Sequence, residues 1–184
     1  MLKYYDHLLT EDECKEIKDE FLLYFQKNLC RHELGGGDLK NSYGYFNLPT
    51  CLKYTSKIEN RIKNDYGKNI VFVNNYIRVY LNDSTMGLHV DRDNLQITLS
   101  LNIFSNLDFD YPLYISNTEL NPAHLHNLYN TKVAEIYKKD FTSWNTLTGS
   151  GVACLAQKYP HWRDDLFCRD DQMMIQAFFH WHYL

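Results

Sequence analysis

The chain has no long hydrophobic run. Although 45% of its 184 residues are hydrophobic, no apolar stretch reaches the roughly 18 residues that a membrane-spanning helix needs. The N-terminal stretch MLKYYDHLLTEDEC turns acidic before the apolar part of a signal peptide can form. We therefore expect a cytoplasmic protein without a membrane segment, folded as one domain over residues 1–184.

A surplus of positive charge and any paired cysteine motif are missing as well. The formal net charge is −4, which argues against nucleic-acid binding, because proteins that bind nucleic acids generally present basic surfaces. The five cysteines are scattered and contain no C-x-x-C pair. We therefore expect free thiols in a reducing compartment and no structural zinc site.

The first third of the chain carries two helix signals. Thr10 and Glu13 have the spacing of a capping box, and helical apolar spacing follows, so a helix is predicted at 11–27. A second amphipathic helix is predicted at 52–66, closed by Gly67. Between them, the three glycines at 35–37 lack the strand-to-helix setting of a phosphate-binding loop, so we interpret them as a structural loop.

From Ile70 onward the hydrophobic period changes to two, as in β-strands. Three strands are predicted, in VFVNNYIRVYL, LQITLSLNI and QMMIQAFFHW, and each has one apolar face and one more polar face. An antiparallel sheet with one face in water would explain this pattern. In the alternative that we prefer, the helices cover the apolar faces and the polar faces line a pocket, as in the jelly roll of cupins.

A candidate metal site lies between the first two of these strands. His89 and Asp91 are two residues apart, so an extended chain directs both side chains to the same face. A histidine from a distant strand would complete two histidines and one carboxylate, the ligand set typical of non-haem iron(II) oxygenases. His161, in YPHWRDDL, follows a glycine turn and an apolar strand and is the preferred third ligand.

Two other histidine pairs compete for the metal. His124 and His126 are two residues apart, as are His180 and His182, so each pair also places two imidazoles on one face of an extended chain. Neither pair has a carboxylate at the required spacing. The triplet around His89 therefore remains the stronger candidate.

The order and spacing of several motifs resemble one known family. Tyr80 lies nine residues before His89, and Arg92 follows Asp91. The stretches LQITLSLNIF, Tyr111-Pro112-Leu113-Tyr114, Gly149-Ser150-Gly151 and His161-Trp162-Arg163 come next. Together, residues 70–184 resemble the 2-oxoglutarate/iron(II)-dependent dioxygenases of the prolyl-hydroxylase-like group. The resemblance implies a mainly β double-stranded β-helix (jelly roll, cupin-like), with residues 1–69 as helical support packed on one sheet.

The resemblance also implies a set of cofactors. Iron(II) would be bound by His89, Asp91 and His161, 2-oxoglutarate would be the cosubstrate, and dioxygen would be the oxidant. Tyr80 would donate its hydroxyl to 2-oxoglutarate; its alternative role is an aromatic residue packed in a core strand. Arg78 and Arg92 would support the metal site or contact the substrate.

The distal carboxylate of 2-oxoglutarate needs a cation. Arg163 is our first candidate, because it shares the face of His161 in an extended segment and a guanidinium offers two parallel hydrogen bonds. Arg169 is the second candidate. Many relatives place the basic residue about ten positions after the second histidine, on the last strand, but that region here reads Arg169-Asp170-Asp171-Gln172.

The predicted function is therefore that of an enzyme, a 2-oxoglutarate- and Fe(II)-dependent dioxygenase. As a hydroxylase it would act on an unactivated C–H bond of an amino acid, a peptide or protein side chain, or a small metabolite. The alternatives are a different metalloenzyme on the same fold and a non-catalytic cupin-like binding module.

Overall fold

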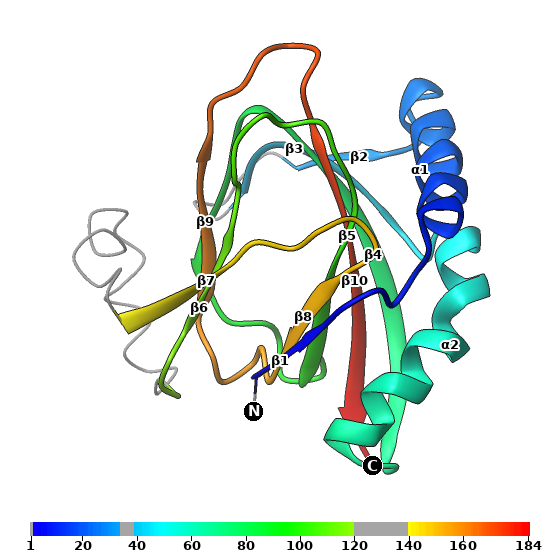
Figure 1. Cartoon of the computed structure of the whole chain (residues 1–184), viewed down its shortest axis with the longest axis vertical. Helices are drawn as coiled ribbons and strands as arrows, with labels where there is room; N and C mark the ends of the chain where they lie inside the picture. The colour runs from blue at the N-terminus through cyan, green and yellow to red at the C-terminus, as the bar shows by residue number, and fades with distance from the viewer. Residues whose placement is uncertain (1, 34–38, 120–139) are drawn as a thin grey trace.

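The structure is a computed structural model that describes residues 2–33, 39–119 and 140–184 (Figure 1). Helices and strands follow one another as β1 (Leu2–Tyr5), α1 (Glu11–Gln26), β2 (Arg31–Glu33), β3 (Leu39–Phe46), α2 (Pro49–Tyr66), β4 (Ile70–His89), β5 (Ile97–Ser105), β6 (Leu113–Ser116), β7 (Phe141–Trp144), β8 (Gly151–Cys154), β9 (His161–Leu166) and β10 (Met174–Tyr183). The predicted mainly β class with N-terminal helices is confirmed.

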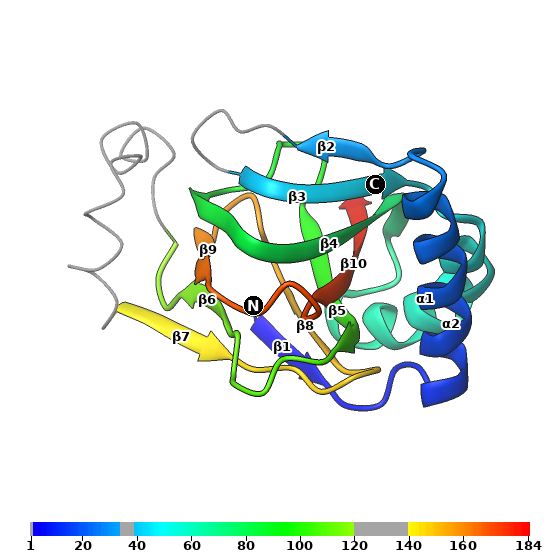
Figure 2. The ribbon, with the colours of Figure 1, turned by 90° about the horizontal axis from the view of Figure 1, so that it is seen from above.

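The strands form an antiparallel sheet that curls on itself into a half-barrel (Figure 2). The hydrogen-bonded order is β1-β8-β5-β10-β4-β9-β6-β7, and β3 pairs with both β2 and β4. Strand β4 is 20 residues long; its first half pairs with β10 and its end pairs with β9. Between these two parts Asp83 has a φ of 68°, and the register of β4 with β3 shifts. The irregularity bends β4 from one side of the curl to the other.

Both helices lie on the same side of the sheet (Figure 1). Helix α1 begins at the predicted capping box, in which the Thr10 hydroxyl accepts the Glu13 N–H and the Glu13 carboxylate accepts the Thr10 N–H. Helix α2 begins at Pro49, earlier than predicted, because a proline is well tolerated in the first turn of a helix. It ends at Gly67, which has a φ of 95°. The two predicted helices are confirmed.

The two faces of the central strands differ as the alternation predicts. The residues that face the helices are apolar and fully buried: Ile77, Val79, Ile97, Leu99, Leu101, Ile175, Phe179 and Trp181. The polar faces turn into the half-barrel, where Ser100 is 4% exposed, Asn102 4% and Gln176 0%. The alternative of a sheet with one face in water is therefore wrong, and the polar faces line the interior.

The turn before β8 connects the N-terminal segment to the sheet. Gly149 has a φ of 80°, and a Cβ atom at this position would lie 2.2 Å from the carbonyl oxygen of Leu9. The Leu9 N–H donates to the Gly149 carbonyl at 3.1 Å, and the Gly149 N–H donates to the Asn102 carbonyl at 2.8 Å. This close approach of two backbones requires glycine.

Two parts of the sequence interpretation fall outside the described residues. They are the glycine loop at 35–37 and most of the polar segment 116–144, which we expected to rim the opening of the barrel. At the ends of that segment the structure has β6 and β7, which pair with each other. Neither of the two described helices is long and apolar enough to cross a membrane.

Candidate metal centre

Three side chains of metal-ligand type meet where β4 ends and β9 begins. His89 is the last residue of β4, His161 is the first of β9, and the two are paired in the ladder. Asp91 follows shortly after β4, and its N–H donates to the Ala156 carbonyl at 3.0 Å. The Asp91 Oδ1 atom lies 3.8 Å from Nε2 of each histidine, and the ligand atoms are all within 4.8 Å of one another. In the described part of the chain, no other cluster of three such groups could hold a metal ion.

Backbone carbonyls select the tautomer of both imidazoles. Nδ1 of His89 lies 2.8 Å from the Gly87 carbonyl, and Nδ1 of His161 lies 3.1 Å from the Tyr159 carbonyl. A carbonyl can only accept, so each Nδ1 carries the proton and each neutral ring keeps a lone pair on Nε2. Both lone pairs then face the carboxylate of Asp91. Three electron-rich atoms this close repel one another unless a cation lies among them, so the donor set fits a divalent metal.

The pKa shifts of His89 and Asp91 also suit metal binding. Burial lowers the pKa of His89, and the proximity of His161 lowers it further. Burial by itself would raise the pKa of Asp91, but the two histidines and the hydrogen bond from the Thr98 hydroxyl to Oδ2 outweigh that effect and lower it. Neutral imidazole and ionised carboxylate are the forms that bind a metal.

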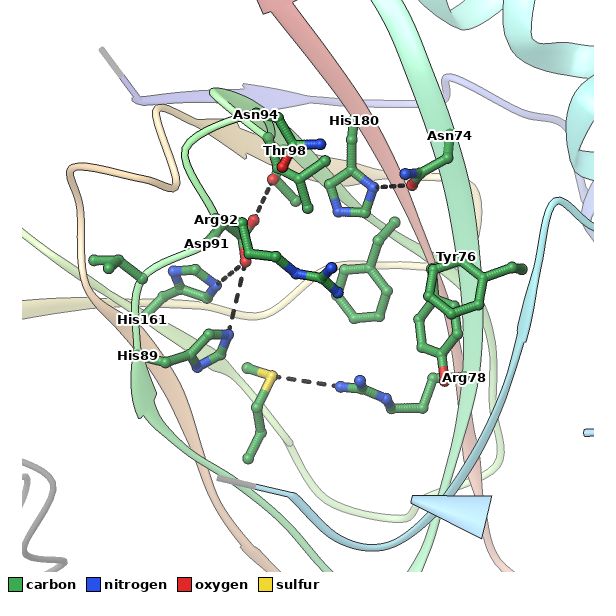
Figure 3. Close-up of a pocket in the computed structure, with 15 residues that line it drawn as sticks. Asn74, Tyr76, Arg78, His89, Asp91, Arg92, Asn94, Thr98, His161 and His180 are labelled. Carbon is green, nitrogen blue, oxygen red and sulfur yellow. Dashed lines mark hydrogen bonds and ion pairs between the residues drawn. The ribbon is translucent and has the colours of Figure 1, made fainter. Parts of the chain in front are cut away.

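The triad forms one wall of a cavity of about 420 Å³ (Figure 3). This volume is within the range of about 300–1,000 Å³ that is usual for small-molecule sites. His180 reaches the same cavity but is not part of the ligand cluster; its Nδ1 lies 2.8 Å from the Asn74 side-chain oxygen. The other competing pair, His124 and His126, lies outside the described residues.

Arg163 and Tyr80 lie deeper than the walls of this cavity. Arg163 is 2% exposed and Tyr80 is 0% exposed, and the guanidinium carbon is 5.6 Å from the centre of the Tyr80 ring. Arg163 donates to the Tyr111 carbonyl and, at 2.8 Å, to Oε1 of Gln176. Nε of Arg163 and Nε2 of Gln176 have no hydrogen-bond partner among the described residues. The buried Arg163 guanidinium and the neighbouring Gln176 amide thus each have one donor without an acceptor, an arrangement that favours the binding of an anion.

A second arginine, Arg78, faces the cavity from β4. Its Nε atom lies 2.7 Å from the carboxylate of Glu33, although the N–H is not aligned for a hydrogen bond. Glu33 also accepts the hydroxyl of Tyr76. The rings of Tyr76, Tyr80 and Phe178 surround the guanidinium, with centroids 5.3, 5.7 and 5.4 Å from its carbon atom. Glu33 therefore neutralises the Arg78 charge, and the rings hold its position.

The other arginine that the sequence offered for an anion is on the surface. The Arg169 side chain is 64% exposed and lies 2.8 Å from the carboxylate of Asp108. It does not line the cavity.

Three polar residues of the site were missed from the sequence. Thr98 and Gln176 are on the predicted polar faces, so their inward direction follows from strand alternation. Their partners depend on how distant strands pair, which the alternation does not specify. Glu33 is on β2, a strand of three residues, and no pattern in the sequence connects it with Arg78.

No protein-family model and no curated protein matches the sequence. Solved structures do match the fold. A prolyl-4-hydroxylase from Pseudomonas putida aligns with a TM-score of 0.71 at 11% identity, over 100% of this chain and 92% of its own. HygX from Streptomyces hygroscopicus, with nickel and 2-oxoglutarate bound, aligns with a TM-score of 0.71 at 10% identity, over 99% and 82%. The 2-oxoglutarate-dependent epimerase SnoN from nogalamycin biosynthesis aligns with a TM-score of 0.72 at 10% identity, over 99% and 80%.

These similar structures include a hydroxylase and an epimerase, so the fold is shared among enzymes that catalyse different reactions. The likeness covers nearly the whole chain, including the strands that carry the triad. The protein therefore has the jelly-roll fold of the 2-oxoglutarate- and iron(II)-dependent oxygenases, as its sequence motifs indicated, and it carries a His-Asp-His candidate metal site.

Proposed function

We propose that this protein is a 2-oxoglutarate- and Fe(II)-dependent oxygenase that hydroxylates an unactivated C–H bond. The observation that carries the proposal is the convergence of two Nε2 lone pairs and one carboxylate on a single point at the wall of the cavity. Three protein ligands leave coordination positions open for exogenous molecules. The unpaired cysteines support the cytoplasm as its compartment.

Iron(II) and 2-oxoglutarate supply the oxidative chemistry of such an enzyme. One molecule each of 2-oxoglutarate and dioxygen gives succinate and carbon dioxide, and the second oxygen atom of dioxygen enters the substrate C–H bond as a hydroxyl group. The residues of the chain bind and orient. His89, Asp91 and His161 hold the metal, and the Gly87 and Tyr159 carbonyls keep the imidazoles turned toward it.

Arg163 is proposed to bind the distal carboxylate of 2-oxoglutarate. Its support is the buried guanidinium, which has no carboxylate within 4.0 Å in the described part of the chain, and the two free donors at Nε and on Gln176. The contact with Arg163 fixes the orientation of the Gln176 amide, because Arg163 can only donate and must face the amide oxygen. The NH₂ group of Gln176 is therefore the end that has no partner among the described residues. Arg169, by contrast, is exposed and already paired with Asp108, so it does not offer a buried donor that lacks an acceptor.

Tyr80 is proposed to donate its hydroxyl to the same cosubstrate. The hydroxyl lies 3.5 Å from the sulfur of Met86, and Met86 lines the cavity. Met86 thus touches both the open cavity and Tyr80, and it is paired with Arg163 in the ladder. A methionine side chain is flexible, so a displacement of Met86 would connect the metal with the deeper pair.

The proposal is tested with protein loaded with Ni(II), the metal present together with 2-oxoglutarate in the structure of HygX. We expect 2-oxoglutarate to bind the wild type and Arg163→Ala to weaken it at least about a hundredfold, because removing one partner of a buried charged pair typically costs about 3–5 kcal/mol. Arg163→Lys keeps the charge without the planar fork and should give an intermediate loss.

Arg169→Ala is the matched control and should bind 2-oxoglutarate as the wild type does. If Arg169→Ala loses affinity and Arg163→Ala does not, the anchor is assigned wrongly. Release of succinate by iron-loaded wild type in air, and its loss in His161→Ala, tests the reaction itself. Metal binding with no affinity for 2-oxoglutarate in any variant would favour a different metalloenzyme on this fold.

A further inference from the structure

The part of the cavity away from the triad has an aromatic wall. Phe46, Tyr76 and Phe178 line it, and the Phe46 and Tyr76 rings contact each other with centroids 4.4 Å apart. Phe46 stands at the end of β3 and is 50% exposed. An aromatic ring left half in water at the rim of a cavity is a favourable contact surface for the apolar part of a ligand.

Among the described residues, the same cavity has one guanidinium group that no carboxylate neutralises. Arg78 and Arg92 both line it, and Glu33 neutralises Arg78. Arg92 follows Asp91, and Figure 3 shows its side chain extending across the cavity. Within the described residues no carboxylate lies within 4.0 Å of the Arg92 guanidinium. Arg92 is thus the available cation at the mouth.

The remaining polar groups do not cancel this charge. Asn74, Asn94 and Thr98 are neutral, and the His180 imidazole carries no negative charge. Iron(II), Asp91, 2-oxoglutarate and Arg163 would together carry no net charge. The mouth therefore stays positive even with both cofactors bound, and a positive site attracts an anionic ligand.

We propose that the primary substrate is a small organic carboxylate with an apolar or aromatic body. Its carboxylate binds Arg92, and its body lies on the surface formed by Phe46, Tyr76 and Phe178. This inference rests on the proposed oxygenase function and names the substrate class for that site. A single guanidinium suits the single charge and planar fork of a carboxylate, whereas phosphate sites commonly gather several donors.

Three probes separate charge from aromatic body. Phenylacetate has both, phenylacetamide is its neutral isostere, and acetate has the charge alone. Binding is measured by NMR line broadening and calorimetry with protein saturated with Ni(II) and 2-oxoglutarate, so that the metal and the deeper arginine are already engaged. We expect phenylacetate to bind about fivefold more tightly than phenylacetamide, the size of effect expected of an exposed ion pair. It should also bind more tightly than acetate, which lacks the apolar body that packs on the aromatic wall.

Arg92→Gln should abolish the preference for phenylacetate over phenylacetamide. The control is Arg61→Gln, an exposed arginine on α2, which should keep it. Phe46→Ala should weaken both aromatic probes and leave acetate unchanged. Equal binding of all three probes to the wild type, or an unchanged preference in Arg92→Gln, would overturn the proposal, as would tighter binding of phenyl phosphate than of phenylacetate.

The two proposals fail in different ways. If 2-oxoglutarate binds the Ni(II)-loaded protein and the probes show no preference, the substrate class is wrong and the oxygenase assignment stands. If 2-oxoglutarate does not bind, the oxygenase assignment is wrong. The probes are then repeated with Ni(II) alone, and a preference that depends on Arg92 would still identify an organic-acid site.

Discussion

The metal ligands depend on single contacts that come from outside the triad. The Thr98 hydroxyl donates to Oδ2 of Asp91, which leaves Oδ1 directed toward the histidines. Thr98 is on β5 and is 5% exposed. One hydroxyl on a neighbouring strand thus decides which carboxylate oxygen is available for a metal.

At this scale we expect Thr98→Val to weaken Ni(II) binding about tenfold or more, because groups that orient metal ligands typically contribute 10–100-fold to affinity. Valine keeps the shape and removes the donor. Thr98→Ser keeps the donor and should bind nearly as the wild type does. Calorimetric titration checks both variants; wild-type affinity in Thr98→Val would show that the hydroxyl does not orient Asp91.

At the scale of the elements, regular patterns were predictable and long-range pairing was not. The alternation in β4, β5 and β10 predicted which side chains face the helices, because successive side chains of a strand point to opposite faces of the sheet and the apolar set is the one that is buried. The capping box at Thr10 located the start of α1. Strand β2 escaped prediction, because three residues carry no period and its position is set by pairing with β3. The same limit hid the contact between Glu33 and Arg78.

Two glycines with positive φ allow the effect of backbone strain on the free energy of unfolding to be separated from the effect of a steric contact. Gly149 and Gly67 both have positive φ, but only at Gly149 would a Cβ atom meet another backbone, 2.2 Å from the Leu9 carbonyl oxygen. We expect Gly67→Ala to lower the free energy of unfolding by about 1–3 kcal/mol, the cost of an unfavourable backbone conformation. Gly149→Ala should lower it further, because the N-terminal segment must also move.

Urea unfolding, followed by circular dichroism, measures both variants. Equal losses of unfolding free energy in Gly149→Ala and Gly67→Ala would mean that the backbone around Leu9 moves away from the added methyl group without lowering stability. The described structure gives Gly67 no neighbour within 4 Å of its added Cβ, so its loss of stability contains no contribution from a steric clash.

At the scale of the whole molecule, the metal site joins parts that are distant in the sequence. His89 and His161 belong to adjacent strands of the curled sheet, and no covalent link other than the chain connects them. A ligand that binds only the folded state stabilises it by mass action. The triad therefore couples metal occupancy to the stability of the barrel.

We expect Ni(II) at about a hundredfold over its dissociation constant to stabilise the fold by about 2.7 kcal/mol and to raise the thermal midpoint by roughly 5–10 °C. Asp91→Ala should show no such shift, and a chelator should reverse the shift in the wild type. A similar rise in the Asp91→Ala variant would place the stabilising metal elsewhere on the chain.

The one-sided placement of the helices has a consequence for local opening. Helices α1 and α2 both lie on the side of β4, β5 and β10, whereas β9 pairs with the end of β4 and with β6 (Figure 1). Backbone amides of β9 should therefore exchange with solvent deuterium sooner than those of β10, since regions with fewer buried apolar contacts open more easily. A metal bound by His89 at the end of β4 and by His161 at the start of β9 would link these two strands. Metal binding should therefore slow amide exchange in β9 far more than in β10, and a comparison of the exchange rates with and without metal would show which strands the metal stabilises.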